Sequence, residues 1–206
     1  MMTISLSDTG KRFNRDWIFR HLNYQFESGH AYAVTGPNGS GKSTLLQALS
    51  GATVINEGTI RYEHQGKPLA DEQVYREVSI CAPYLELIEE MTALEFLEFH
   101  GGFKSFLPGL DSASILDKVG LQHASQKQIR YYSSGMKQRL KLAQCILSDT
   151  AMVFLDEPCT NLDEAGITLY HSLIDHYCKN RLVIVSSNDP IEYRFCTQKI
   201  LITHYK

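Results

Sequence analysis

Apolar and polar residues alternate along most of the first 80 positions of the 206-residue chain, and this pattern predicts β-strands. The alternation is clear at Ile4 and Leu6 and again over residues 21–26. Further short strands are predicted at residues 31–35, 58–62 and 78–82. The first part of the chain is therefore expected to be rich in β-structure.

The middle of the chain has the wider apolar spacing that is typical of helices. Predicted helices cover residues 93–100 and 112–118, and a third begins directly after residues 133–135. Thr92 can cap the first helix, and Gly101 and Gly102 are predicted to end it. Asp111 can cap the second helix.

Strands and helices alternate in the last third of the chain. The apolar segments 151–155 and 181–186 are predicted strands, residues 165–177 form a predicted helix, and residues 199–203 are expected to form an edge strand. Apolar strands separated by helices are typical of a mostly parallel sheet that is covered on both faces. The expected fold class is therefore α/β.

A glycine-rich segment follows the predicted strand 31–35 and carries the clearest chemical signal. Residues 36–44 read GPNGSGKST and match the phosphate-loop pattern G-x-x-x-x-G-K-[ST]. Glycines let backbone N–H groups curl around a di- or triphosphate, Lys42 can reach the β- and γ-phosphates, and the Ser43 hydroxyl can bind Mg²⁺. The sequence therefore predicts a nucleoside triphosphate site. The residues expected to contact the nucleotide are Gly36, Pro37, Asn38, Gly39, Ser40, Gly41, Lys42, Ser43 and Thr44.

Two adjacent carboxylates, Asp156 and Glu157, follow the apolar strand 151–155. Ligands of open α/β sheets bind at the C-terminal ends of the strands, where this strand delivers both side chains. Asp156 is expected to hold Mg²⁺ through its water shell, and Glu157 to polarise a water molecule for in-line attack on the γ-phosphate. The alternative is a strand that simply ends in solvated acidic residues.

The predicted helix after residues 133–135 offers a second N-terminus suited to an anion. The segment reads Ser-Ser-Gly and precedes Lys137, Gln138 and Arg139. By itself the pattern is equally typical of a serine N-cap followed by a basic first turn.

Composition narrows the possible roles. The net charge of −3 argues against a nucleic-acid surface, and no apolar run reaches the roughly 18 residues of a membrane span. The five cysteines are widely separated without a C-x-x-C pair, so a reducing cytosol is expected rather than a zinc site or a disulfide framework. The length of 206 residues predicts one domain, or one domain with an inserted subdomain.

Four motifs, in their order along the chain, resemble those of the ATP-binding cassette (ABC) ATPases. They are residues 36–44, 132–139 (YSSGMKQR), 153–158 (VFLDEP) and 161–163 (NLD), and the resemblance covers nearly the whole chain. It implies a single P-loop NTPase domain over residues 1–206, with an N-terminal antiparallel β-subdomain and a helical subdomain at about residues 85–140. The short length is closest to the haem-exporter type of ATP-binding subunit.

The same resemblance implies roles outside the phosphate loop. Phe13 stands where the family stacks an aromatic ring on adenine, and Trp17 is the second candidate. Two copies of the chain are expected to sandwich ATP, so that Ser133 and Gly135 of one copy close on the γ-phosphate bound by the other. ATP and Mg²⁺ are the implied ligands.

Two positions depart from the family pattern. Tyr84 stands in place of a glutamine that touches Mg²⁺ and the attacking water, and a tyrosine is a poor neutral ligand for Mg²⁺. Asn188 stands in place of a histidine that contacts the γ-phosphate, and it can donate an amide N–H but cannot carry charge. Because Glu157 is retained, hydrolysis is expected with Glu157 and Asn188 as its catalytic residues, at a reduced rate.

The leading prediction is an ATP-hydrolysing subunit that drives a separate membrane permease from the cytoplasmic face of the cell membrane. Residues 85–106 are expected to dock the permease, although their apolar side chains are favoured as core: Leu85, Leu87, Ile88, Phe96 and Phe99. One alternative is a cassette protein that acts in a cytosolic assembly without a permease. Another is a degenerate, regulatory cassette that binds ATP while a different subunit hydrolyses it.

Overall fold

The computed structural model describes residues 1–206, and its elements group into two compact units. The first unit comprises residues 1–80, 150–157 and 179–206. The second unit comprises residues 81–149 and 158–178. The chain therefore leaves the first unit and returns to it twice.

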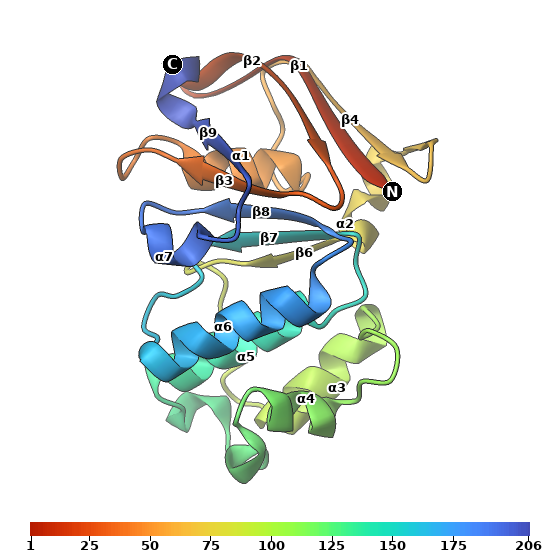
Figure 1. Ribbon diagram of the computed structural model, residues 1–206, viewed down its shortest axis with the longest axis vertical. Helices are drawn as coiled ribbons and strands as arrows, with labels where there is room; N and C mark the ends of the chain where they lie inside the picture. Colours follow the sequence, from red (N-terminus) through yellow and green to blue (C-terminus); the bar gives the residue numbers. More distant parts are fainter. The chain divides into compact units, whose positions relative to one another are not determined.

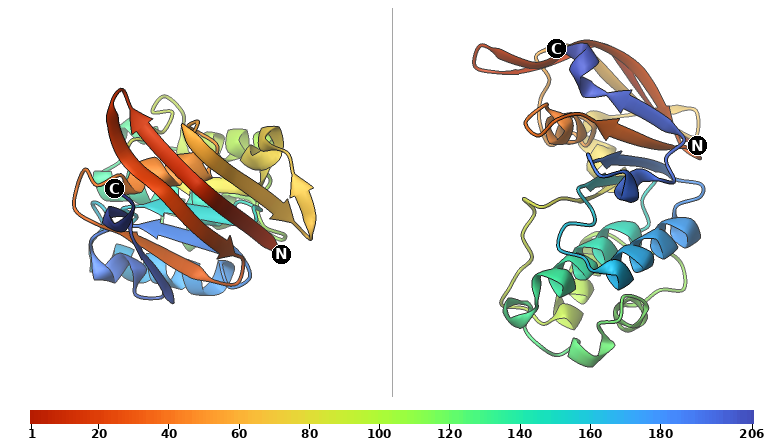
Figure 2. Two further views of the ribbon diagram at one scale, coloured as in Figure 1. Left: turned by 90° about the horizontal axis from the view of Figure 1, so that it is seen from above. Right: turned by 60° about the vertical axis from the view of Figure 1, so that its left-hand side comes forward.

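An antiparallel sheet in the first unit has the strand order β2-β1-β4-β5. Its strands are β1 (Met2–Phe13), β2 (Asp16–Glu27), β4 (Glu57–His64) and β5 (Lys67–Leu69). Strand β1 pairs with both β2 and β4, and Figure 2 shows the three strands side by side. Met2, Ile4 and Leu6 of β1 are buried, because alternate residues of a strand point to the same face.

A second sheet of the first unit has the order β6-β7-β8-β3-β9. Its strands are β3 (Ala31–Thr35), β6 (Val78–Cys81), β7 (Met152–Asp156), β8 (Leu182–Ser186) and β9 (Gln198–Leu201). The pairs β7–β8, β8–β3 and β3–β9 are parallel, and β9 lies at one edge. The prediction of a mostly parallel sheet is confirmed.

The hydrophobic core of the first unit is formed by both sheets together with helix α1 (Lys42–Leu49). Leu45, Leu46 and Leu49 of α1 are fully buried, and Figure 1 shows this helix between the antiparallel sheet and β3. Gly51 follows the C-cap Ser50 with a φ of +76°, a left-handed conformation in which glycine commonly ends a helix. The unit also contains the short helices α2 (Val74–Glu77) and α7 (Pro190–Tyr193), and the 3₁₀ turns 71–73 and 202–205.

Helices dominate the second unit. They are α3 (Ala93–Phe103), α4 (Ser112–Lys118), α5 (Ser134–Ile146) and α6 (Glu164–Tyr177), with 3₁₀ turns at residues 122–124 and 129–131. Helix α5 packs against the other three, and Figure 1 shows α5 and α6 side by side. The apolar stripe of α5 is buried at Leu140 and Ala143, which explains why the helical spacing was readable from the sequence.

Capping side chains set the starts of α3 and α4 as predicted. Thr92 and Glu95 form a reciprocal capping box, and Asp111 accepts a hydrogen bond from the third residue of α4. The predicted end of α3 at Gly101 and Gly102 is wrong, because neither glycine has a positive φ and the helix continues to Phe103. Glycine permits a helix to end but does not require it.

The apolar residues between 85 and 99 divide between interior and surface. Leu87 and Phe96 are buried, as the core interpretation predicted. That interpretation is wrong for three others, since Leu85, Ile88 and Phe99 are 37%, 39% and 47% exposed. Leu85 and Ile88 lie in the irregular segment between β6 and α3, where helical spacing does not apply. The Phe99 ring meets the still more exposed Phe103 ring edge to face, with 4.9 Å between centroids and 65° between the ring planes.

Candidate nucleotide-binding site

The phosphate loop joins the buried strand β3 to helix α1. Gly36, Gly39 and Gly41 all have positive φ, at +147°, +73° and +106°. A Cβ on Gly41 would lie 2.3 Å from Cγ2 of Ile18, so only glycine fits there. A Cβ on Gly36 would lie 2.8 Å from Ser40 Oγ, so the loop depends on glycine at Gly36 as well as at Gly41.

Helix α1 begins without a capping side chain and without an acidic residue in its first turn. Its first N–H groups and the positive end of its dipole are thus left for an external partner. Ser43 and Thr44 are half-buried in this first turn. A helix N-terminus of this kind, directly after a glycine-rich loop, is suited to bind phosphate.

Lys42 places a cation inside the loop. The residue is only 5% exposed, and its Nζ donates hydrogen bonds to the Gly36 oxygen at 2.9 Å and the Pro37 oxygen at 3.3 Å. These carbonyls share the ammonium group, which has three N–H donors. The charge is therefore already oriented within the loop where phosphates are expected.

Asn188 lies beside the loop although it is 150 residues away from Asn38 in the chain. The Gly36 N–H donates to its Oδ1 at 3.3 Å, and its Nδ2 donates to Asn38 Oδ1 at 3.0 Å. The N–H of Gly36 fixes which carboxamide atom is the oxygen, because a donor requires an acceptor. The structure thus brings Asn188 and the phosphate loop together, and a role for Asn188 toward the γ-phosphate stays a prediction.

Asp156 ends β7 with a buried, unsatisfied carboxylate. The residue is 2% exposed, and its Oδ1 has no hydrogen-bond partner. It pairs in register with Ser186 of β8, whose hydroxyl is likewise buried without a partner. Buried polar atoms are almost always satisfied, so these orphan oxygens indicate that a ligand belongs at this edge of the sheet.

Glu157 follows Asp156 in a strained backbone conformation. Its φ is +46°, and its N–H donates to the Ser186 oxygen at 2.9 Å. A side chain other than glycine at positive φ is uncommon, and such strain concentrates at functional sites. The Glu157 side chain is half-buried at this position.

Ser133 and Gly135 belong to the second unit, at the start of α5. Ser133 is the N-cap, and its hydroxyl accepts a hydrogen bond from the Met136 N–H at 3.3 Å. Ser133 is exposed and the first turn contains no acidic residue, so this N-terminus is open to an anion.

The polar residues that follow Gly135 on α5 have partners within the second unit. Lys137 pairs with Glu89, and Arg139 Nη2 lies 3.1 Å from Asp163 Oδ1. The two cations of the predicted basic first turn are therefore neutralised by carboxylates. Gln138 between them is 6% exposed and donates to the Pro158 oxygen at 2.7 Å. The burial of Gln138 cannot be predicted from the sequence, because a glutamine between two cations gives no local signal of burial.

The two aromatic candidates for adenine stacking differ in how their rings are used. Phe13 is 49% exposed at the end of β1, with the Lys11 ammonium 4.8 Å from its ring centroid. The Trp17 ring has the Arg20 guanidinium 4.5 Å from its centroid. Phe13 thus offers the more accessible ring.

Tyr84 is 46% exposed after β6, and its role stays a prediction.

The phosphate loop follows a buried parallel strand, and an aspartate ends a second parallel strand. These two features together define a P-loop nucleotide-binding protein. The profile of the family described as ABC transporter matches residues 19–160. The chain therefore belongs to the ABC transporter family of ATP-binding cassettes, as its motifs indicated. It is the ATP-binding and ATP-hydrolysing subunit of such a transporter.

Two kinds of curated relatives are similar over most of the chain. The uncharacterized ABC transporter ATP-binding protein YybJ of Bacillus subtilis is 29% identical over 192 residues, which are 90% of this chain and 85% of the relative. The cytochrome c biogenesis ATP-binding export protein CcmA of Albidiferax ferrireducens is 30% identical over 194 residues, with 92% and 91% covered. The expected likeness to haem-exporter ATP-binding subunits is thus confirmed.

Solved structures share the fold. A putative ABC transporter ATP-binding protein from Pyrococcus furiosus has a TM-score of 0.81 at 20% identity, with 99% of both chains covered. A dimeric ATP-binding cassette in a post-hydrolysis state with ADP and Pi has a TM-score of 0.81 at 20% identity, with 97% of this chain and 94% of that chain covered. The predicted P-loop NTPase fold is confirmed.

None of the helices combines the length and apolar character that a membrane crossing requires.

Proposed function

We propose that the chain binds ATP together with Mg²⁺ at the phosphate loop, with the adenine ring stacked on Phe13. The observation that carries this proposal is the open N-terminus of α1 behind a loop that already holds the buried Lys42 ammonium. Backbone N–H groups of residues 36–44 would bind the phosphates. The exposed Phe13 ring supports the stacking role, since aromatic rings attract flat bases.

The donor set beside the loop fits Mg²⁺. This ion prefers oxygen ligands and commonly takes one or two carboxylates or hydroxyls together with phosphate oxygens. Asp156 has a buried carboxylate oxygen without a partner, and Ser43 has a hydroxyl in the first turn of α1. We assign these two residues as its protein ligands. Bound there, the ion would neutralise charge on the β- and γ-phosphates.

Glu157 is the general base in this proposal. Its carboxylate takes a proton from water while the water oxygen bonds to the γ-phosphorus and the bond from that phosphorus to the ADP oxygen breaks. The positive φ of Glu157 supports the assignment, because the strain needs a reason. Asn188 would donate an amide N–H to a γ-phosphate oxygen.

The transporter subunit acts as a dimer with a membrane partner in this proposal. Ser133 and Gly135 of a second copy would close on the γ-phosphate, and the open N-terminus of α5 supports that role. A separately encoded permease would dock on residues 85–106, where Leu85, Ile88 and Phe99 are exposed. The cassette would then work at the inner face of the cell membrane.

The base assignment is tested with Glu157→Gln. We expect kcat for ATP to fall at least about 100-fold because the proton acceptor is lost, while ATP affinity stays within twofold. Glu164→Gln is the control, since Glu164 is exposed in the first turn of α6. A Glu157→Gln variant that hydrolyses ATP like the parent would show that Glu157 is not the base.

The permease is tested by affinity purification of the tagged chain from detergent-solubilised native membranes, followed by mass spectrometry. A multi-span membrane protein in near-stoichiometric amount is the expected partner. Recovery from the soluble fraction alone, or with cytosolic proteins only, would contradict the permease and favour an assembly role.

A further inference from the structure

Gln138 joins three segments of the second unit through one side chain. It lies on α5 one turn after Gly135 and is only 6% exposed. Its Nε2 donates to the Pro158 oxygen at 2.7 Å and lies 3.8 Å from Cys81 Sγ at the end of β6. Because a carbonyl only accepts, the bond to Pro158 fixes the orientation of the carboxamide.

Pro158 is the residue that follows Glu157 in the chain. A proline has a fixed φ and no N–H, so its carbonyl is the only backbone group by which its position can be held. Glu157 itself is strained at a φ of +46°, and a strained residue keeps its conformation only when its surroundings impose it. Its N–H is bound to Ser186, and the next carbonyl along is bound to Gln138.

We propose that Gln138 is a positioning residue for ATP hydrolysis, which it supports by holding Pro158 and thereby the direction of the Glu157 carboxylate. The inference rests on the proposed role of Glu157 as the base. The same hydrogen bond connects α5, whose N-cap is Ser133, to Pro158, the residue that follows Glu157. A general base acts only within hydrogen-bond reach of its proton, so a small displacement of Glu157 is costly.

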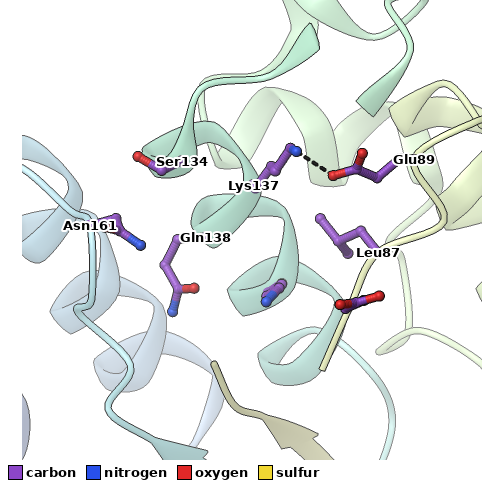
Figure 3. A pocket seen from close by; sticks show the side chains of 8 residues that line it. Leu87, Glu89, Ser134, Lys137, Gln138 and Asn161 are labelled. Carbon is purple, nitrogen blue, oxygen red and sulfur yellow. Dashed lines mark hydrogen bonds and ion pairs between the residues drawn. The ribbon is translucent and has the colours of Figure 1, made fainter. Parts of the chain in front are cut away.

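Gln138 can be replaced without overfilling the core. It lines a pocket of about 390 Å³ together with the loop residues Glu86, Leu87 and Glu89 and with Asn161. Figure 3 shows the side chains of Gln138 and Asn161 at this pocket, with the Lys137–Glu89 ion pair beyond them. The pocket gives a substituted side chain room to adjust, so variants at this position are suitable probes.

The first measurement compares Gln138→Met with the parent protein in full-length form with Mg²⁺ and ATP. We expect kcat to fall at least tenfold and the ATP dissociation constant to change less than twofold, because a displacement of about 1 Å can cost about 100-fold in rate. Gln144→Met is the matched control on the same helix, since Gln144 bonds His100 instead. Its kcat should stay within twofold of the parent.

The variant Gln138→Glu gives a pH signature that packing alone would not produce. A protonated carboxyl can donate to the Pro158 oxygen, whereas an ionised one repels it. The kcat of this variant, relative to the parent, should therefore fall at least fivefold as the pH rises from 6 to 9. A relative kcat that does not change with pH would contradict the proposal. If Gln138→Met does not fold, the pH dependence of Gln138→Glu is the measurement that tests the proposal.

A double variant separates this inference from the proposed function. In a Glu157→Gln background, Gln138→Met should cause no further loss of the residual rate, because both changes act through the same base. A further loss as large as in the parent, or a kcat of Gln138→Met within twofold of the parent, would overturn the role of Gln138 while leaving Glu157 as the base. A Glu157→Gln variant with full activity would instead overturn the proposed base, and Gln138 with it.

Discussion

The carboxamide of Asn188 donates a hydrogen bond to the side-chain oxygen of Asn38, with 3.0 Å between the two atoms. Its own oxygen accepts a bond from the Gly36 N–H at 3.3 Å. An asparagine amide has two N–H donors, so one remains for a phosphate oxygen. A neutral side chain therefore lies beside the phosphate loop at the position where the family pattern has a histidine.

Replacing Asn188 by histidine is expected to raise the rate of ATP hydrolysis. A protonated imidazole makes a charge-assisted hydrogen bond to the developing charge on the γ-phosphate, and one such contact is worth roughly 100-fold or more in kcat. Steady-state kcat is the measurement. An unchanged rate would show that another group already supplies this contact.

Lys42→Met should abolish the stabilisation of the protein by ATP. It should not lower the stability of the protein measured without ATP. The ammonium is buried and held only by backbone carbonyls, so a methionine of similar size removes a desolvated charge and the main phosphate contact. ATP at about 100 times its dissociation constant stabilises a protein by about 2.7 kcal/mol, which a thermal melt detects. Lys141→Met serves as the control and should keep the shift. An ATP-induced shift in Lys42→Met equal to the parent's would rule out the phosphate contact.

Thr92→Ala should destabilise the protein by about 1 kcal/mol in urea unfolding, because it removes the N-cap of α3. Hydrogen bonds from the Thr92 N–H and hydroxyl also lower the pKa of Glu95. That part of the stability is present above the ordinary pKa of a glutamate and is lost as the pH falls through the lowered value. Thr168→Ala, in the exposed middle of α6, should cost less than about 0.5 kcal/mol.

Stability should decrease as the pH falls from about 6.5 towards 4 because of His100. Burial, and then the nearby Lys104, lower its pKa from 6.5 to about 4. Between these values the unfolded chain binds a proton that the folded chain does not, so the loss begins near 6.5 and is complete near 4. In urea titrations across this range, His100→Gln should lose less stability than the parent. The exposed His123→Gln should follow the parent, and a His100→Gln profile that does the same would contradict the assignment.

Local chemistry explains what could be predicted. The phosphate loop was identified because its glycines and Lys42 act within nine consecutive residues, and positive φ at Gly36 and Gly41 is a property of glycine itself. Helix starts at Thr92 and Asp111 follow from side chains that bond their own backbone. The limits of a helical subdomain, expected at about residues 85–140, stay a prediction.

The sequence by itself determined the nucleotide loop, the caps and the alternation of strands and helices, because each depends on neighbours a few residues apart. Only the tertiary structure decided that Asn188 bonds Asn38 and that Gln138 donates a hydrogen bond to the Pro158 oxygen. The same is true of the ion pairs that Lys137 and Arg139 of α5 form with Glu89 and Asp163. The members of these pairs lie between 20 and 150 residues apart. These contacts form because the packing of the elements brings side chains from distant segments within hydrogen-bond reach, and the buried amide of Gln138 in addition needs a partner in place of water.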